Sequence, residues 1–345
     1  MTRPDASPTG IAFWRERFGA AQRAAGGVCE RTLAIGRCRV RLRFAGEDLI
    51  PGLLESLSLR LSAEPTSVPH LTVHLWDVAG TGISVFEGAV PSEAFRSTRS
   101  DGATMAAGFE PVSRTVRAVS PAGDEAWWQV QDARDLHIDL RGSPLRDLLH
   151  VALRRAGMPL LHAGAVGRPD GGVLLVGPGG VGKSTTALSC LGSRLRLLSE
   201  DYTAISLEDR PFAEAIYGSS KLNDDSLGWM PALAGAVSNP DHGPGVKNLL
   251  HLHRAMPEAL VERFPLKAVL VVGRNTGSGT RFVPTSRAEA LRALAPSTLL
   301  QMPGSTGLEM GWIAGIVRAL PSFRLLTGTD LAAIPPAIEE LIDLE

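Results

Sequence analysis

The chain has 345 residues, of which 44% are hydrophobic and 21% are charged, and this length is enough for two domains of ordinary size. Its net charge of -1 provides no basic field that would recruit nucleic acid or an anionic membrane surface. No apolar run approaches the ~18 residues of a membrane span, and the first residues lack the apolar core of a signal peptide. We therefore expect a cytoplasmic protein with neither a nucleic-acid nor a membrane partner.

Residues 1–142 have the pattern of a β-rich α+β domain, whose role no motif indicates. Polar and apolar residues alternate in several runs that glycine and proline bound, as in half-buried strands. The expected strands are 39–44, 70–76, 104–109, 113–119 and 126–130, and the expected short helices are 11–24 and 47–56. We expect Trp127 and Trp128 to pack in a core or at a domain interface rather than to bind a ligand.

The cysteines indicate neither a disulfide framework nor a zinc site. Cys29, Cys38 and Cys190 are odd in number, form no CxxC pair and have no zinc-type spacing. Cys29 and Cys38 either pair with each other or are small core thiols, and we favour the second interpretation.

The pattern changes to an α/β domain at residue 143, so we expect a second domain over 143–345. Ser143 is expected to cap a helix that has Pro144 at its first position, and apolar residues then follow at helical spacing as far as Leu153. The elements expected after it are strands 159–166, 172–176, 194–198 and 268–272 and helices 183–190, 286–294, 308–320 and 331–344. The polar stretch 219–257 is too long for a simple connector, and is either a lid or substrate loop or a surface insertion without function.

A phosphate-binding loop is the most specific motif of the chain. The run Gly177-Pro178-Gly179-Gly180-Val181-Gly182-Lys183-Ser184 matches G-x-x-x-x-G-K-[ST] and lies between an expected buried strand and an expected helix. Glycines let backbone N–H groups turn toward phosphate oxygens, and the Lys183 side chain can reach the β- and γ-phosphates. The Ser184 hydroxyl can bind Mg²⁺, and Thr185 can donate to a distal phosphate. We therefore expect ATP and Mg²⁺ as cofactors.

The segments on either side of this loop supply further candidate residues. Upstream, His162 lies in the apolar run 160–166, about one hairpin before the loop. Downstream, an apolar run ends in Glu200 and Asp201, and a carboxylate at a strand end near such a loop is suited to bind Mg²⁺ or accept a proton. Alternatively, His162 is a satisfied core histidine, and either acid only caps a strand or pairs with an arginine.

The order and spacing of these segments resemble the C-terminal kinase domain of HPr kinase/phosphorylase, a family related to phosphoenolpyruvate carboxykinase. In that family a strand with a histidine precedes a hairpin, the phosphate-binding loop follows, and the next strand ends in two acids. The similar stretch here runs from His162 to about Ile205, and the resemblance covers roughly half of the chain. The segment 217–222 resembles one in HPr-kinase-like proteins of biosynthetic gene clusters, some of which phosphorylate a serine of a lasso-peptide precursor.

The resemblance implies a mixed sheet flanked by helices, a homo-oligomer and particular roles for the site residues. Asp201 is implied to lie near Mg²⁺ and the acceptor hydroxyl, with Glu200 as the second acid and His162 near the active site. The chain departs from the family in having Glu200 before Asp201 and Thr185 after Ser184, and it lacks a Glu-Ile-Arg-Gly-like signature downstream. These differences disfavour HPr as the acceptor and disfavour a reverse phosphorylase reaction.

Lysine is rare in this chain, which makes each lysine position informative. Only four of the 35 basic residues are lysines, and Lys221 is a candidate to neutralise charge on the transferring phosphoryl group. Lys247 is a weaker candidate of the same kind. Nothing in the sequence selects among three arginines as anion contacts, and three histidines are more simply solvated loop residues than metal ligands: Arg274, Arg281, Arg318, His242, His251 and His253.

These motifs lead to one functional hypothesis and two alternatives. We expect an ATP-dependent kinase that transfers the γ-phosphoryl group to a hydroxyl, by resemblance a serine of a peptide or protein. The nearest variant is a kinase for the hydroxyl of a small molecule. The alternative from another class is a nucleotide-binding or slow ATPase module that serves as a scaffold or switch in a biosynthetic complex.

Overall fold

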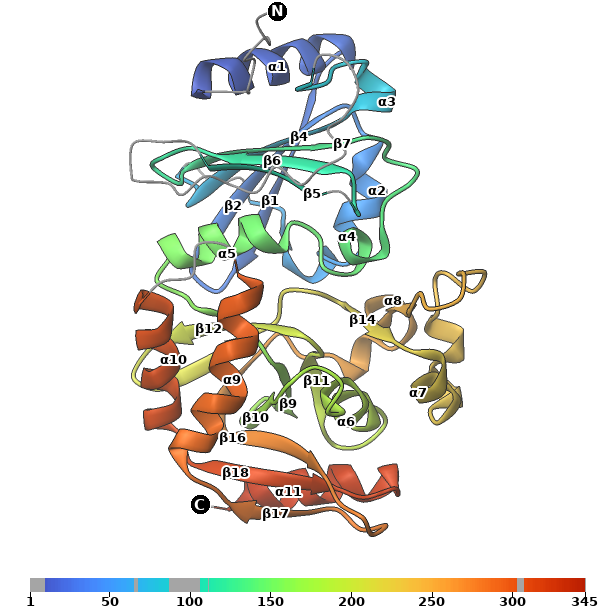
Figure 1. The fold of residues 1–345 in the computed structure, drawn as a ribbon, viewed down its shortest axis with the longest axis vertical. Coiled ribbons are helices and arrows are strands. Elements are labelled where there is room, and N and C mark those ends of the chain that lie inside the picture. The colour runs from blue at the N-terminus through green and yellow to red at the C-terminus, as the bar shows by residue number, and fades with distance from the viewer. Residues whose placement is uncertain (1–9, 65–67, 87–105, 111, 303–306, 345) are drawn as a thin grey trace, which may run out of the picture. The chain divides into compact units, whose positions relative to one another are not determined.

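The computed structural model describes residues 10–64, 68–86, 106–110, 112–302 and 307–344. The chain divides into two compact units (Figure 1). Unit 1 comprises Met1–Ala34, Cys38–Glu55 and Leu61–Ala156, and unit 2 comprises Ile35–Arg37, Ser56–Arg60 and Gly157–Glu345. Residue 142, where we expected the domain boundary, lies within unit 1 in this division. Within the described ranges, no helix is both long enough and apolar enough to cross a membrane.

Unit 1 contains a mixed sheet of seven strands in its described part, in the order β3-β1-β2-β4-β7-β6-β5. The central pairs β2–β4 and β4–β7 are parallel, and the pairs β1–β3, β6–β7 and β5–β6 are antiparallel. The strands are β1 Val28–Ile35, β2 Cys38–Ala45, β3 Leu61–Ser62, β4 Leu71–Asp77, β5 Ala106–Glu110, β6 Thr115–Val119 and β7 Glu125–Val130. The strands expected from polar and apolar alternation are confirmed, except that residues 104 and 105 lie outside the described residues.

Helices cover both faces of this sheet (Figure 1). The helices of unit 1 are α1 Ile11–Ala24, α2 Leu49–Leu54, α3 Val78–Thr81, α4 Ile138–Gly142 and α5 Arg146–Arg155. Trp14 and Phe18 of α1 pack in one cluster with Trp76 and Trp127, while α5 packs on β2 and β4 on the opposite face. Both faces are therefore buried, which explains why Trp127 and Trp128 are both core residues, as the sequence predicts.

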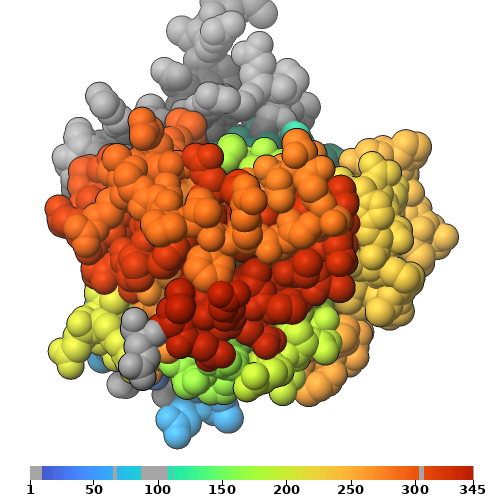
Figure 2. Space-filling model, turned by 90° about the horizontal axis from the view of Figure 1, so that it is seen from below, coloured from blue at the N-terminus to red at the C-terminus, as the bar shows by residue number. Residues whose placement is uncertain are grey.

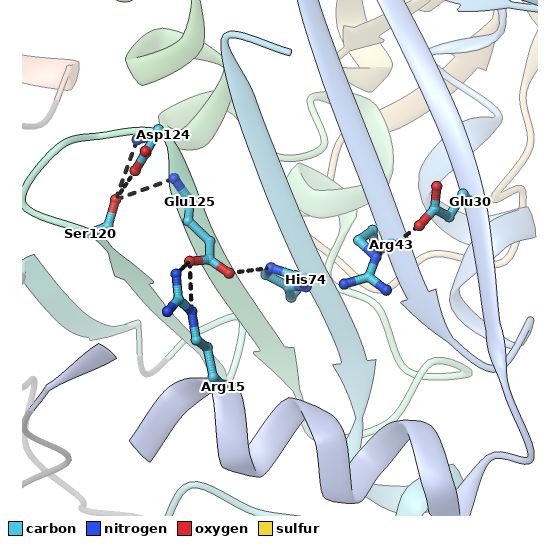
Figure 3. Close-up of polar contacts among 7 residues, drawn as sticks. All are labelled: Arg15, Glu30, Arg43, His74, Ser120, Asp124 and Glu125. Carbon is cyan, nitrogen blue, oxygen red and sulfur yellow. Dashed lines mark hydrogen bonds and ion pairs between the residues drawn. The ribbon is translucent and has the colours of Figure 1, made fainter. Parts of the chain in front are cut away.

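Polar groups tie α1 to the sheet beneath it (Figure 3). Glu125 of β7 accepts a hydrogen bond of 2.6 Å from Arg15 of α1, and its second oxygen lies 2.8 Å from Nε2 of His74 in β4. On a neighbouring strand, Arg43 donates to Glu30 at 2.8 Å. Glu125 thus joins a helix and two strands through one carboxylate that is mostly shielded from solvent.

Unit 2 contains a larger mixed sheet, with nine strands in its described part. Seven lie in the order β11-β9-β10-β16-β13-β12-β8, and β18 pairs with both β16 and β17. The pairs β10–β16 and β16–β18 are parallel. The strands are β8 Leu160–His162, β9 Gly164–Arg168, β10 Gly171–Val176, β11 Arg196–Ser199, β12 Tyr202–Leu207, β13 Pro211–Glu214, β16 Arg263–Arg274, β17 Arg281–Pro284 and β18 Ser322–Thr327; a separate antiparallel pair consists of β14 Ser219–Leu222 and β15 Asn248–His251.

Two hydrophobic layers enclose this sheet. Val173 and Leu175 of β10 pack in a cluster with α6 and α11, whereas Leu174 and Val176 pack in a second cluster with α9 and α10. A strand that is buried on both faces reads as a continuous apolar run, as β10 does. The helices of unit 2 are α6 Lys183–Ser189, α7 Asp224–Gly228, α8 Leu252–Ala255, α9 Arg287–Gln301, α10 Gly307–Ala319 and α11 Ile334–Asp343, with 3-10 turns η1 Ser58–Arg60, η2 Pro231–Ala236, η3 Pro257–Ala259 and η4 Leu331–Ala333.

The C-terminal helix closes one side of unit 2. Arg168 at the end of β9 forms an ion pair with Asp343, and Lys267 Nζ donates to the carbonyl oxygen of Ile342 at 2.9 Å. Figure 2 shows that the red surface of the C-terminal segment borders a green surface, which belongs to an earlier part of the same chain. These contacts anchor α11 to β9 and β16, the two strands that flank β10.

Two sequence predictions for residues 143–166 are wrong in detail. Ser143 does not cap a helix: it follows α4, and α5 begins only after Leu145, which has a left-handed backbone with φ of 55°. The expected strand 159–166 is two strands, because β8 pairs with β12 while β9 pairs with β10 and β11. The run gives no sign of this break, since the residues on both sides of it are buried.

The stretch 219–257 is not a structureless loop. It contains β14 and β15, the short helices α7 and α8 and the 3-10 turn η2, and its buried Leu222, Leu233 and Leu250 join the core of unit 2. The helix expected at 286–294 continues through Pro296 to Gln301, and Ala290, Leu294 and Ala295 pack in the second hydrophobic cluster, with Leu174 and Val176 of β10. All three cysteines are free thiols, and Cys29, which is half-buried, is not a core residue.

Candidate functional site

The glycine-rich loop connects β10 to α6 in the order that the motif predicts. Gly177, Gly180 and Gly182 have φ angles of 152°, 77° and 111°, which favour glycine over any residue with a Cβ. A Cβ added at Gly180 or Gly182 would meet no atom within 4 Å, so open space adjoins the loop backbone at these positions. Glycine is required here by backbone conformation rather than by crowding.

Lys183 lies across the loop that precedes it. Its Nζ donates to the carbonyl oxygens of Gly177 at 2.8 Å and Pro178 at 3.2 Å, and its side chain is buried. Burial lowers the pKa of Lys183, and the negative charges of Asp201 and Glu200 act in the opposite direction. The ammonium group is therefore within electrostatic reach of both acids that the sequence analysis selected.

Glu200, the residue after β11, is a buried acid whose carboxyl group contacts α6, the helix that follows the loop. It accepts a hydrogen bond of 3.3 Å from the backbone N–H of Lys221 and another from the Ser184 hydroxyl. Burial, reinforced by the charge of Asp201, raises the pKa of Glu200 to about 7. Its carboxyl group is thus shared between α6 and β14.

Asp201 faces a different partner from its neighbour. Oδ1 of Asp201 lies 2.7 Å from Nε2 of His162, which is 7% exposed. Burial alone would raise the pKa of Asp201, but the contact with His162 and the charges of Lys221 and Lys183 hold it below the usual value. The structure therefore brings three other predicted site residues, His162, Lys221 and Lys183, within reach of the Asp201 carboxylate.

Strand pairing explains why these residues meet. β12 and β8 are antiparallel, and Tyr202 lies directly opposite His162 in their register, so that the histidine is beside the end of the acidic pair. A Cβ on Gly164, at the start of β9, would lie 3.0 Å from the carbonyl oxygen of Glu200. The close approach of these two chain segments favours a glycine at that position.

Other predicted residues lie at varying places in unit 2. Thr185 donates to Ser226 of α7 at 3.4 Å, and Arg274 donates to the carbonyl oxygen of Gly180 at 3.4 Å. The exposed Lys247 lowers the pKa of Lys183 after the larger effect of burial, so it belongs to the same charged region. Two arginines lie exposed on other elements, in β17 and in α10: Arg281 and Arg318.

The histidines of the segment 219–257 do not form one group. Nε2 of His242 lies 3.4 Å from Oδ1 of Asp224 and 3.1 Å from Oδ1 of Asn248. The rings of His251 and His253 meet edge to face, with 5.6 Å between their centroids. His242 therefore has a structural role beside α7.

Sequence analysis did not select two residues that contact His162. Gln301, the last residue of α9, places its Nε2 atom 3.2 Å from His162 Nδ1, and Tyr202 donates to Gln301 Oε1 at 2.6 Å. Tyr202 has one local signal, since it directly follows the acidic pair. No local signal in the sequence points to Gln301, because it lies beyond Pro296, before which the predicted helix ends.

Comparisons with known proteins were made for the whole chain. No protein-family model matches it, and neither does any curated protein. A solved structure, the HPr(Ser) kinase/phosphatase from Coxiella burnetii, aligns with 53% of this chain and 93% of its own length, at 11% sequence identity and a TM-score of 0.30. A likeness at this level carries no argument about the fold or activity of the chain.

Proposed function

We propose that the chain binds ATP with Mg²⁺ at residues 177–185 and transfers the γ-phosphoryl group to a hydroxyl. One observation carries the proposal: Lys183 is within electrostatic reach of two acids, and one of them accepts a hydrogen bond from Ser184. A cation, a hydroxyl and two carboxylates thus gather beside a glycine-rich loop with open space next to its backbone.

The loop supplies the groups that bind the triphosphate. Backbone N–H groups between Gly177 and Lys183 can donate to phosphate oxygens, as they do in other phosphate-binding loops. Lys183 Nζ now donates to two loop carbonyl oxygens, and phosphate oxygens would replace these as acceptors. The ammonium group would then neutralise charge on the β- and γ-phosphates.

The donor atoms present are suited to Mg²⁺. Ser184, Glu200 and Asp201 offer only oxygen, which this ion prefers, and the connection of Ser184 to Glu200 places two of these donors together. Ser184, Asp201 and Glu200 would hold the ion, which neutralises phosphate charge when bound. The low pKa of Asp201 keeps its carboxylate ionised and available at neutral pH.

Asp201 would act on the acceptor during transfer. The acceptor oxygen forms a bond to the γ-phosphorus, the bond from that phosphorus to the β–γ bridging oxygen breaks, and ADP leaves with the bonding electron pair. The proton of the acceptor hydroxyl passes to the carboxylate of Asp201. Lys183 and Lys221 would stabilise the charge that develops on the phosphoryl oxygens, since both already act on Asp201.

The acceptor that we favour is a serine hydroxyl of a peptide or protein. This choice depends on the resemblance of the segment 217–222, which includes β14 and carries Lys221. A small-molecule hydroxyl would need the same site groups. The two acceptor classes are therefore separated by experiment and not by the residues around Asp201.

One observation favours the alternative of a nucleotide-binding or slow ATPase module. The carboxyl group of Glu200 is buried beside Asp201, which raises its pKa to about 7, and it accepts the hydrogen bond of Ser184. A protonated Glu200 would weaken metal binding, and water could then be the only acceptor. This alternative keeps the binding role of Lys183 but removes the transfer role of Asp201.

Nucleotide binding is tested first, by calorimetric titration of the full chain with ATP and Mg²⁺. Lys183→Ala should weaken binding about 10- to 100-fold, as expected for loss of a charge-assisted contact. Lys267→Ala is the matched control, because Lys267 donates to Ile342 in another part of unit 2, and it should bind normally. Equal affinities of both variants would contradict a site at this loop.

Transfer is then followed with γ-labelled ATP and two acceptor sets, serine-containing peptides and small hydroxyl compounds. Asp201→Asn should bind ATP but lose transfer by about 10²- to 10⁴-fold, while the exposed Asp209→Asn should retain it. Label released only as free phosphate with every acceptor would refute the kinase and support the slow ATPase. Absence of any nucleotide binding would refute both.

A further inference from the structure

His162 is the middle member of a chain of hydrogen bonds that ends at Asp201. The Tyr202 hydroxyl donates to Gln301 Oε1 at 2.6 Å, and Gln301 Nε2 lies 3.2 Å from His162 Nδ1. On the other side of the ring, His162 Nε2 lies 2.7 Å from Asp201 Oδ1. The ring is buried, so these neighbours determine where its protons lie.

The distances assign a direction to each bond. A separation of 2.6 Å is usual for an O–H···O bond and short for N–H···O, so the amide oxygen of Gln301 faces the tyrosine. Its NH₂ group, which can only donate, then faces His162 Nδ1. Nδ1 must therefore accept and carry no proton, which leaves the ring proton on Nε2, where it is donated to Asp201.

The end of α9 holds both the backbone and the ring of His162. One turn before Gln301, the buried Thr298 accepts a hydrogen bond of 3.1 Å from the backbone N–H of His162. Tyr202 lies opposite His162 across the β8–β12 pair, with 5.4 Å between their ring centroids. Two side chains of one helix and one from a neighbouring strand thus locate the imidazole.

We propose that Gln301, oriented by Tyr202, is a positioning residue that keeps the ring proton of His162 on Nε2 and so holds Asp201 in one orientation. Oδ1 of Asp201 is engaged by the ring proton, which reserves Oδ2 for the metal or the acceptor hydroxyl. The catalytic consequence rests on the proposed function, whereas the tautomer itself does not. Outer hydrogen-bond partners of this kind orient catalytic groups in many enzymes.

The tautomer is measured by long-range ¹H–¹⁵N spectra of the full chain with ¹⁵N-labelled histidine, and His162→Gln assigns the signals. The wild type should show a protonated Nε2 and an unprotonated Nδ1. Gln301→Met has nearly the same shape without the donor, and should give averaged signals of both tautomers. Tyr202→Phe should give a smaller change in the same direction, and Tyr217→Phe, which removes the other tyrosine hydroxyl, should give none.

An activity measurement separates positioning from a merely structural role. Gln301→Met should lower kcat about ten-fold and leave the KM for ATP unchanged, because the loop that binds ATP is untouched. A wild type with protonated Nδ1, or a Gln301→Met variant that keeps the wild-type tautomer, would overturn the proposal. If the tautomer is as stated but no acceptor is ever phosphorylated, the proposed function fails and the hydrogen-bond assignment stands. If transfer occurs and Gln301→Met leaves kcat unchanged, the positioning role fails.

Discussion

The free energy of unfolding of unit 1 should depend on pH through His74, which is buried beneath α1 (Figure 3). The centroid of its ring lies 4.5 Å from that of Phe18 and 5.6 Å from that of Trp127. Nε2 contacts Glu125 at 2.8 Å, and Nδ1 has no hydrogen-bond partner among the described residues. A charge on this ring would be poorly solvated and would have only one acceptor.

Burial lowers the pKa of His74 to about 4 from its ordinary value of 6.5. The contact with Glu125 opposes this effect, and the nearby charges of Arg43 and Arg15 add to it. The unfolded chain takes up the proton first, so stability is fully present above pH 6.5 and is lost as the pH falls toward 4. At about 1.4 kcal/mol for each pH unit, the difference corresponds to about 3 kcal/mol.

The assay is denaturant unfolding at a series of pH values between 7 and 4, followed by tryptophan fluorescence. Trp14, Trp76 and Trp127 lie in the cluster around His74 and report on unit 1. His74→Gln keeps a donor for Glu125 but does not titrate, so its stability should fall by about 3 kcal/mol less than that of the wild type over this range. The control His137→Gln removes a partly exposed histidine of the same unit and should keep the wild-type slope. Parallel curves for wild type and His74→Gln would refute the reasoning.

Two further substitutions test the packing and capping of unit 2. Gly167→Ala would bring its Cβ within 2.4 Å of the Gly172 backbone and force β9 from β10, so thermal unfolding should show a loss of about 3 kcal/mol, whereas Gly235→Ala, with no atom within 4 Å, should be nearly neutral. Ser286→Ala removes the side-chain oxygen that accepts from the backbone N–H of Glu289 at the start of α9, and should cost about 1 kcal/mol in the same measurement. An unchanged midpoint for Gly167→Ala would mean that the two strands can separate freely, and a neutral Ser286→Ala would mean that water replaces the cap.

Local patterns predicted much of the secondary structure. The helix over 11–24 has the expected bounds, and the strand, loop and helix around Lys183 follow in the expected order. These features depend on residues close together in the chain, such as apolar spacing along a helix or glycines that adopt positive φ. The same local information predicted an end of the α9 helix near Pro296, where packing against the sheet instead carries it to Gln301.

The partners of the candidate site could be predicted only in part. His162, Glu200 and Asp201 were selected from their positions relative to the loop, and the structure brings them near Lys183. Gln301 could not be selected, because it lies 139 residues from His162 in the chain and belongs to a helix whose length depends on tertiary packing.

By itself, the sequence determined the conformation of the glycine-rich loop, since positive φ angles at Gly180 and Gly182 require residues without a Cβ. Only the tertiary structure decided how the adjacent acids differ. Glu200 is buried beside Asp201, which raises its pKa against the opposing hydrogen bonds from α6 and β14, while Asp201 meets His162, which helps to lower its pKa. The pairing of β8 with β12 and the position of β14 produce this division, because both join segments that are distant in the chain and that no local pattern connects.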